Sequence, residues 1–224
     1  MIVCNKKKIA IFLVPKTGTV SLCSIFRPLN LYYNQHSHHT YDKAVLNFSS
    51  KLDGFNRYKF FAFYREPIDR FASAIAYFRR TLYKELLSMF YGNQIQISCA
   101  SVKPYDTLPP DLKAKIEAIT ISQMLDSNYF KFAENSLIKP QHLWLNNPKI
   151  SMEYLNFHRY NEEVSNLLSM FGVKNPTNSF PQLNRSISGY ANDKLSEQEM
   201  GKVVKMYEED YNFFDDVGIK FKGT

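Results

Sequence analysis

The sequence predicts an α/β fold in which a central parallel sheet is flanked by helices in three layers. Two segments support this prediction, residues 9–26 and residues 58–80, because each begins with a short apolar run and continues as a helical pattern. Neither run alternates with polar residues, which is typical of strands that are buried on both faces of a parallel sheet. The 224-residue chain is long enough for one large domain with a substantial core.

The composition indicates a folded protein with an anionic partner. Apolar residues make up 45% of the chain and charged residues 22%, which are ordinary values for a soluble globular domain. The formal net charge of +7 favours an anionic ligand without selecting among them. The three cysteines contain no C-x-x-C pair, which argues against a disulfide framework or a zinc site. We expect a cytoplasmic protein with no signal peptide and no membrane span.

The loop between the first strand and the first helix predicts an anion-binding site. The strand is expected over residues 9–14, and the helix begins at residue 19 or 20. Between them Lys16 adds a positive charge, and Gly18 permits an unusual backbone angle. Backbone N–H groups and the dipole at a helix N-terminus favour a phosphate-like anion. The expected ligands from this loop are Lys16, Thr17, Gly18, Thr19, Val20 and Ser21.

The alternative for this loop is a simple strand–helix turn with a solvated lysine. The loop is P-loop-like in its strand–loop–helix order, but it is not a Walker motif, which has its lysine directly after a second glycine. Lys16 instead precedes Gly18, the one glycine of the loop. An ordinary ATPase or GTPase is therefore disfavoured.

Residues 35–45 contain three of the five histidines of the chain, His36, His38 and His39. Such a cluster suggests a metal, but the carboxylate or thiolate partners of many metal sites are not evident nearby. One histidine could instead be a general base, because an imidazole pKa of about 6.5 suits proton removal at neutral pH. Plain surface histidines are the third interpretation.

The second strand–helix unit has an arginine at the carboxyl end of a buried strand. The strand is expected over residues 58–64, Arg65 follows it, and Ser73 lies about two turns into the next helix. Open α/β sheets bind ligands where such strands end, so Arg65 and Ser73 could meet one phosphate. The alternative is a structural ion pair between Arg65 and Glu66 or Asp69.

Weaker patterns complete the predicted order of elements. We expect residues 1–224 to form a single domain with a helical and loop insertion at about residues 81–150. This insertion is where we expect the choice of substrate to be determined. Ser196 and Glu199 form a capping box at the start of the last helix. Its expected core residues are Met200, Val203, Val204 and Tyr207. The other expected elements are an edge strand over residues 31–33, a helix from Thr40 to about residue 48, a long helix from Pro67 to residue 91, a helix over residues 113–125, a strand over residues 150–157, a helix over residues 161–171 and the last helix over residues 196–214.

Three motifs in this order resemble the sulfotransferases, particularly the carbohydrate group that includes the heparan sulfate 2-O-sulfotransferases. PKTGTVSL, residues 15–22, is similar to the 5′-phosphosulfate loop of that family. REPIDRFASAIAYF is similar to its 3′-phosphate segment, whose arginine and serine fall on Arg65 and Ser73, with Glu66 where the family has aspartate. HSHHTY resembles a His-x-His segment whose second histidine, the proposed catalytic base, falls on His38.

The resemblance implies a reaction without a metal, in which 3′-phosphoadenosine 5′-phosphosulfate (PAPS) sulfates a hydroxyl, expected to be on a carbohydrate. The product would be adenosine 3′,5′-bisphosphate. Lys16 would stabilise charge on the leaving phosphate, and His38 would remove the proton of the hydroxyl. His36 and His39 would orient His38 or contact the acceptor.

Two further segments resemble the family more loosely. The loop over residues 180–190 is similar to a serine-containing stretch near the nucleotide, which implies contacts from Arg185 and Ser186; a solvated loop is the alternative. In KPQHLWL, residues 139–145, Gln141 and His142 could face the acceptor or have core or surface roles.

Two other functions remain open at this point. A nucleotide or small-molecule kinase could use the loop for phosphates, although no magnesium-binding carboxylate is evident beside it. A non-catalytic polyanion binder could depend on the net charge alone. The sulfotransferase interpretation predicts no nucleic-acid partner, and the sequence does not specify an oligomeric state.

Overall fold

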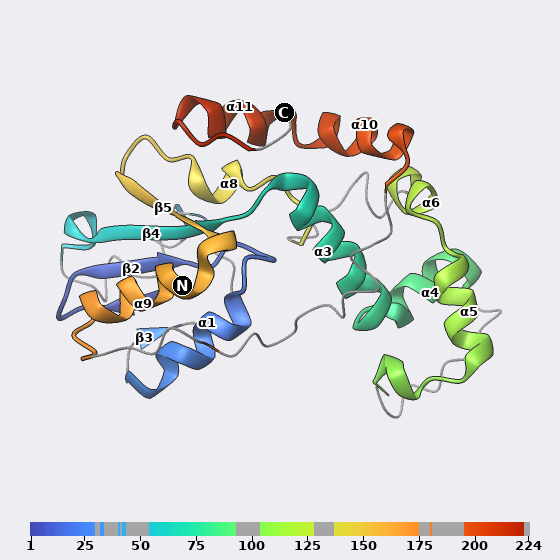
Figure 1. Cartoon of the computed structure of the whole chain (residues 1–224), viewed down its shortest axis with the longest axis horizontal. Helices are drawn as coiled ribbons and strands as arrows, with labels where there is room; N and C mark the ends of the chain where they lie inside the picture. The colour runs from blue at the N-terminus through green and yellow to red at the C-terminus, as the bar shows by residue number, and fades with distance from the viewer. Residues whose placement is uncertain are drawn as a thin grey trace.

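The computed structural model describes residues 1–29, 32–33, 40, 42–43, 54–92, 104–127, 137–174, 180 and 195–221. These residues form a mixed sheet with helices on both faces and a second group of helices beside it (Figure 1). The α/β class is therefore confirmed. Most of the helix predicted after Thr40 lies outside the described residues. Within the described ranges, no helix combines the length and the apolar character that crossing a membrane would require.

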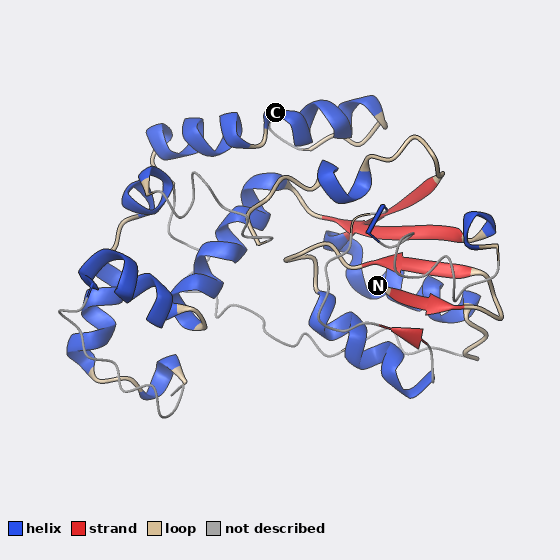
Figure 2. Cartoon of the chain, turned by 180° about the vertical axis from the view of Figure 1, so that it is seen from behind, coloured by secondary structure: helices blue, strands red, loops and turns tan. Residues whose placement is uncertain are grey.

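The sheet has five strands in the order β3-β1-β2-β4-β5 (Figure 2). Its central and outer strands β2, β4 and β5 run parallel, while β1 runs antiparallel to both β2 and β3. The expectation of a parallel sheet is thus right for three strands and wrong for the other two. The strands are β1 (Ile2–Cys4), β2 (Ile9–Phe12), β3 (Tyr32–Tyr33), β4 (Lys59–Tyr64) and β5 (Met152–Asn156).

The first strand was not predicted, because β1 is short and is followed by a run of lysines. The structure shows that these lysines form the turn of a hairpin in which Cys4 pairs with Ile9. The turn is closed by the N–H of Lys8, which donates to the carbonyl of Asn5, and Lys8 has a left-handed backbone with φ 52°. The hairpin extends the parallel sheet by antiparallel pairing on one side.

The two faces of the sheet are covered by different helices, which produces three layers. Along β2, Ile9 and Ile11 point to one face while Ala10 and Phe12 point to the other, as strand geometry requires. The first face packs against α1 (Thr19–Phe26) and α9 (Tyr160–Met170). The second face packs against α8 (His142–Leu145) and α11 (Glu208–Asp216).

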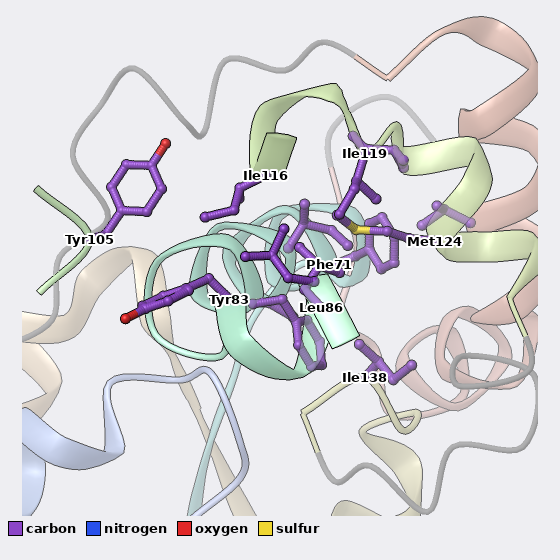
Figure 3. Close-up of a cluster of buried hydrophobic side chains, with 14 of the residues drawn as sticks. Phe71, Tyr83, Leu86, Tyr105, Ile116, Ile119, Met124 and Ile138 are labelled. Carbon is purple, nitrogen blue, oxygen red and sulfur yellow. The ribbon is translucent and has the colours of Figure 1, made fainter. Parts of the chain in front are cut away.

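A separate hydrophobic core lies among the helices away from the sheet (Figure 3). The helix α3 (Pro67–Arg80) leaves the end of β4 and extends into this group, where Phe71 and Leu86 are buried together. The last part of the chain returns to the group through Val203, which is fully buried. The other members are α4 (Tyr83–Tyr91), α5 (Pro110–Ala118), α6 (Ile121–Asp126) and α10 (Glu197–Met206).

Three predicted helices are each broken or divided in the structure. The helix expected from Pro67 to residue 91 is divided between α3 and α4 at Thr81 and Leu82. The helix over residues 113–125 is α5 and α6, separated at Thr120, whose capping box opens α6. The last helix is α10 and α11, which meet at Tyr207. In each case buried apolar residues lie on both sides of the break, so periodicity alone does not reveal the bend. The first two pairs stay within one core, whereas α10 packs in the helical core and α11 packs against the sheet.

Other local predictions are confirmed or corrected residue by residue. Ser196 and Glu199 form the expected capping box at the start of α10. Tyr207 and Val203 are buried as expected, whereas Val204 is wrong as a core residue, since it is 40% exposed. It lies one position after Val203, which rotates it toward the outer side of the helix.

Candidate functional site

The site lies where the three parallel strands β2, β4 and β5 end. Each strand is followed directly by a segment that approaches the other two: the loop containing Lys16, then Arg65, then Phe157. This edge is where open α/β sheets place their ligands. The helices α1 and α3 start from the same edge (Figure 1).

The loop after β2 is closed by a buried side chain. The hydroxyl of Thr17 donates to the carbonyl of Val14 at 2.8 Å, so this hydroxyl holds the turn instead of facing outward. The helix α1 then begins at Thr19, with Gly18 as its N-cap. A glycine has no side chain to cap the helix, and the first turn contains no acidic residue. The positive end of the α1 dipole is therefore left without compensation from these positions.

Gly18 is held against two aromatic rings. Its φ of 77° lies in the left-handed region, and a Cβ atom there would lie 2.9 Å from the ring of Tyr160 and 3.0 Å from that of Phe157. The hydroxyl of Tyr160 also donates to the carbonyl of Gly18 at 3.3 Å. Burial raises the pKa of Tyr160, so the hydroxyl stays protonated and remains a donor. Backbone angle and contact thus both require glycine.

Lys16 is a confined cation. Its Nζ lies 4.3 Å from the centre of the Tyr77 ring, within the range of a cation–π contact. Burial, followed by the charges of Arg65 and Arg70, lowers the pKa of Lys16 to about 8. Among the residues that the structure describes, no carboxylate forms an ion pair with Lys16. A bound anion would relieve this unfavourable accumulation of positive charge.

Arg65 connects the two predicted phosphate-binding segments. Its guanidinium forms a bidentate pair with Asp69, through bonds of 2.6 and 2.9 Å, so the ion pair that the sequence left open is present. A further N–H donates to the carbonyl of Lys16 at 3.2 Å, and the group stacks on Phe157 at 4.6 Å. These contacts engage three of the five N–H donors of the guanidinium.

The helix α3 presents a stripe of side chains to this region. Asp69, Ser73 and Tyr77 are spaced four residues apart, which places them on one helical face. Asp69 contacts Arg65 and Tyr77 contacts Lys16, so Ser73 lies between the two on the side that faces the site. Arg65 and Ser73 are therefore brought to the same region, as their spacing predicted.

Several residues of this site were not identified from the sequence. Tyr77 could have been found, because it follows Ser73 by one helical turn. Phe157 could have been found by the rule that identified Arg65, since it follows a third parallel strand. His158 comes next, is 61% exposed, and has its Nε2 3.7 Å from the carboxylate of Asp69. The contact between Tyr160 and Gly18 joins residues 142 positions apart and has no local signal.

The remaining predicted residues divide between described and undescribed parts of the chain. Thr19 and Ser21 lie in the first turn of α1, where Ser21 is buried and Val20 is 47% exposed. Gln141 is fully buried, which favours its core alternative over direct contact with an acceptor. Five predicted site residues lie outside the described residues: His36, His38, His39, Arg185 and Ser186.

Taken together, the site concentrates positive charge at one edge of the sheet. Lys16, Arg65 and the N-terminus of α1 come from segments that are far apart in the sequence but adjacent in the fold. Such a set is suited to an anion with more than one charged group. The aromatic rings of Tyr77 and Phe157 form apolar surfaces beside the two cations.

Comparison with known proteins shows the family to which the chain belongs. Searches of curated proteins and of solved structures each found no match. A family model described as the sulfotransferase family matches residues 1–215, which include both strand–loop–helix units and the whole of the site. The chain therefore belongs to the sulfotransferase family.

Proposed function

We propose that the protein transfers a sulfuryl group from PAPS to a carbohydrate hydroxyl and releases adenosine 3′,5′-bisphosphate. Membership of the sulfotransferase family supports sulfuryl transfer. The structural observation that carries the proposal is Lys16, a confined cation without a described carboxylate partner, in the loop that opens α1. The resemblance of the histidine segment to the heparan sulfate 2-O-sulfotransferases favours a carbohydrate acceptor.

The residues of the loop fit the phosphosulfate end of this donor. PAPS supplies a sulfuryl group on a 5′-phosphate, whose bridging oxygen gains negative charge as the sulfuryl group leaves. Lys16 and the N–H groups at the start of α1 would stabilise that charge, as donors that are already oriented before reaction. In this P-loop-like arrangement, the left-handed Gly18 lets the backbone approach the phosphate closely.

The 3′-phosphate would be bound at the end of β4. Arg65 uses three N–H donors in the contacts described above, which leaves two of its five donors for the phosphate. Ser73, on the neighbouring face of α3, would donate a further hydrogen bond. We assign Arg185 and Ser186 to the nucleotide on the resemblance alone.

The acceptor hydroxyl must lose a proton during transfer. We propose His38 as the general base, with His36 and His39 orienting it or contacting the acceptor. A positioned imidazole contributes on the order of 10²–10⁴-fold to such a step. His38→Ala should therefore reduce turnover strongly while the affinity for adenosine 3′,5′-bisphosphate stays nearly unchanged.

A transfer assay tests the proposal directly. The protein is incubated with PAPS and a panel of desulfated glycosaminoglycans and simple glycosides, and the products are examined by mass spectrometry for an added sulfo group. We expect at least one carbohydrate to be sulfated by the wild type and not by Lys16→Ala. Transfer of phosphate from ATP to the same panel, without sulfation from PAPS, would contradict the proposal in favour of a kinase.

A further inference from the structure

The backbone of Arg65 is held by a side chain from a distant segment. The pairing of β4 with β5 ends at Tyr64 and Asn156, so Arg65 is the first residue beyond it. Its N–H donates to Oε1 of Gln141 at 3.0 Å, and its carbonyl accepts from Nε2 of Gln141 at 2.7 Å. The Gln141 amide thus bonds both backbone polar groups of Arg65, much as a neighbouring strand would.

Gln141 is itself fixed by a buried carboxylate. Asp210, on α11, is fully buried and accepts hydrogen bonds from the backbone N–H groups of Gln141 and His142, at 2.8 and 2.7 Å. Its Oδ1 also lies 3.0 Å from Nδ1 of His142. A fully buried carboxylate with these partners sets the position of the Gln141 backbone and thereby the reach of its side chain.

These bonds continue from Arg65 to the loop. Arg65 donates to the carbonyl of Lys16, which completes a chain of hydrogen bonds from Asp210 through Gln141 and Arg65 to the anion-binding loop. The side-chain amide of Gln141 is not placed to contact a substrate. Both its oxygen and its nitrogen bond to the backbone of Arg65, and the side chain is fully buried. Its arrangement is that of a support for Arg65.

We propose that Gln141 is a positioning residue, which aims the guanidinium of Arg65 at the 3′-phosphate of the nucleotide. This inference rests on the proposed function, because it assigns Arg65 to that phosphate. In this proposal Gln141 does not contact the nucleotide, and it affects selectivity for the 3′-phosphate only through Arg65. Loss of Gln141 should therefore weaken binding of a 3′-phosphorylated nucleotide and leave binding of the 5′-phosphate by the Lys16 loop largely intact.

The test compares two ligands on the same set of proteins. Calorimetry gives the dissociation constants of adenosine 3′,5′-bisphosphate and of AMP, which lacks the 3′-phosphate. The dissociation constant of AMP divided by that of the bisphosphate is the selectivity ratio, which is large when the 3′-phosphate is recognised and near one when it is not. Gln141→Leu removes both bonds to Arg65 and should reduce this ratio by about tenfold or more, as expected when a charge-assisted hydrogen bond is lost. Gln141→Glu keeps the shape and the acceptor for the Arg65 N–H, and should give an intermediate ratio.

The matched control is Gln123→Leu. Gln123 belongs to the capping box of α6, so its loss reduces stability without touching Arg65. Its ratio should equal that of the wild type. If Gln141→Leu and Gln141→Glu also retain the wild-type ratio, even with lowered melting temperatures, Gln141 has only a structural role and the inference is wrong. A wild-type ratio near one would instead refute the proposed donor, and the inference with it.

Discussion

The guanidinium of Arg65 donates a hydrogen bond to the backbone carbonyl of Lys16 at 3.2 Å, across 49 positions of sequence. Lys16 has a left-handed backbone with φ 66°, so the contact holds the loop at a residue whose conformation is otherwise unfavourable. Two segments that the sequence presents as separate anion sites are therefore one hydrogen-bonded unit. A ligand with two phosphate groups could contact both.

Replacing Lys16 should separate stability from activity. Lys16→Met removes a confined charge, so the free energy of unfolding of the unliganded protein at pH 7 should rise, by about 1–3 kcal/mol, while turnover is lost. The matched control is Lys8→Met. Lys8 also has a left-handed backbone conformation and its Nζ also lies over a tyrosine ring, but it lies at the opposite end of β2. Lys8→Met should retain turnover. A less stable Lys16→Met variant would show that this lysine contributes to folding.

Nucleotide binding should weaken as the pH rises above about 8. The pKa of Lys16 is about 8 in the unliganded protein, and a bound phosphate favours the charged form and raises it. Above pH 8 the free protein must therefore take up a proton to bind, and affinity falls by up to about tenfold per pH unit. Calorimetry at pH 9 in buffers of different ionisation enthalpy should show proton uptake. Affinity that stays constant from pH 7 to 9.5 would contradict this role of Lys16.

The lowered pKa of Lys16 also makes the folding stability of the unliganded protein depend on pH. Because the folded pKa of Lys16 lies below its ordinary value of 10.5, the unfolded chain binds more protons between about pH 8 and 10.5. The contribution of Lys16 to folding stability therefore becomes less unfavourable as the pH rises through this window. In Lys16→Met this contribution should disappear, which a comparison of denaturant unfolding at pH 7.5 and 9.5 would reveal.

Gly18→Ala should lower the free energy of unfolding by more than the left-handed backbone of Gly18 alone explains. Gly218 has the same φ of 77° but nothing within 4 Å of an added Cβ, so Gly218→Ala isolates the backbone cost of about 1 kcal/mol. Gly18→Ala adds the clash with Tyr160 and Phe157, and should lower the free energy of unfolding by at least about 1 kcal/mol more. Denaturant unfolding of both variants measures the difference. Equal losses would mean that the two rings move aside freely.

Arg70 should matter for stability because of the carbonyls it binds. It is fully buried, donates to the carbonyls of Leu137 and Lys139, and lies over the ring of Tyr207. Arg70→Met leaves two carbonyls without their donor, and should lower the free energy of unfolding by about 1–3 kcal/mol. Arg159→Met is the control, since Arg159 is 58% exposed and its pair with Glu162 is screened by solvent, so its loss should change the free energy of unfolding much less. An unchanged Arg70→Met stability would refute this account.

The two strand–loop–helix units were predictable because their signals are local. An apolar run, Gly18 and the following helical pattern lie within 20 residues, and the second run, Arg65 and the helix after it lie within about 25. Short-range backbone rules determine these features, and tertiary contacts only refine their ends. The spacing of Arg65 and Ser73 likewise predicted a shared region.

Long-range relationships could not be predicted in the same way. Gln141 bonds to Arg65 across 76 positions, and Tyr160 bonds to Gly18 across 142. A glutamine before an apolar segment has several equally plausible roles until the fold brings its partner near. The break at Tyr207 was missed for a related reason, because buried positions continue at helical spacing across it, from Val203 through Tyr207 to Phe214.

Calorimetric titration of the wild type with adenosine 3′,5′-bisphosphate, alongside ADP and AMP, tests the central claim most directly. The account predicts that the 3′,5′-bisphosphate binds at least about tenfold more tightly than either nucleotide that lacks the 3′-phosphate, because Arg65 contributes a charge-assisted contact only to the former. It also predicts that Lys16→Ala weakens all three. Equal binding of the three nucleotides, or no binding of the bisphosphate, would contradict a PAPS-dependent sulfotransferase.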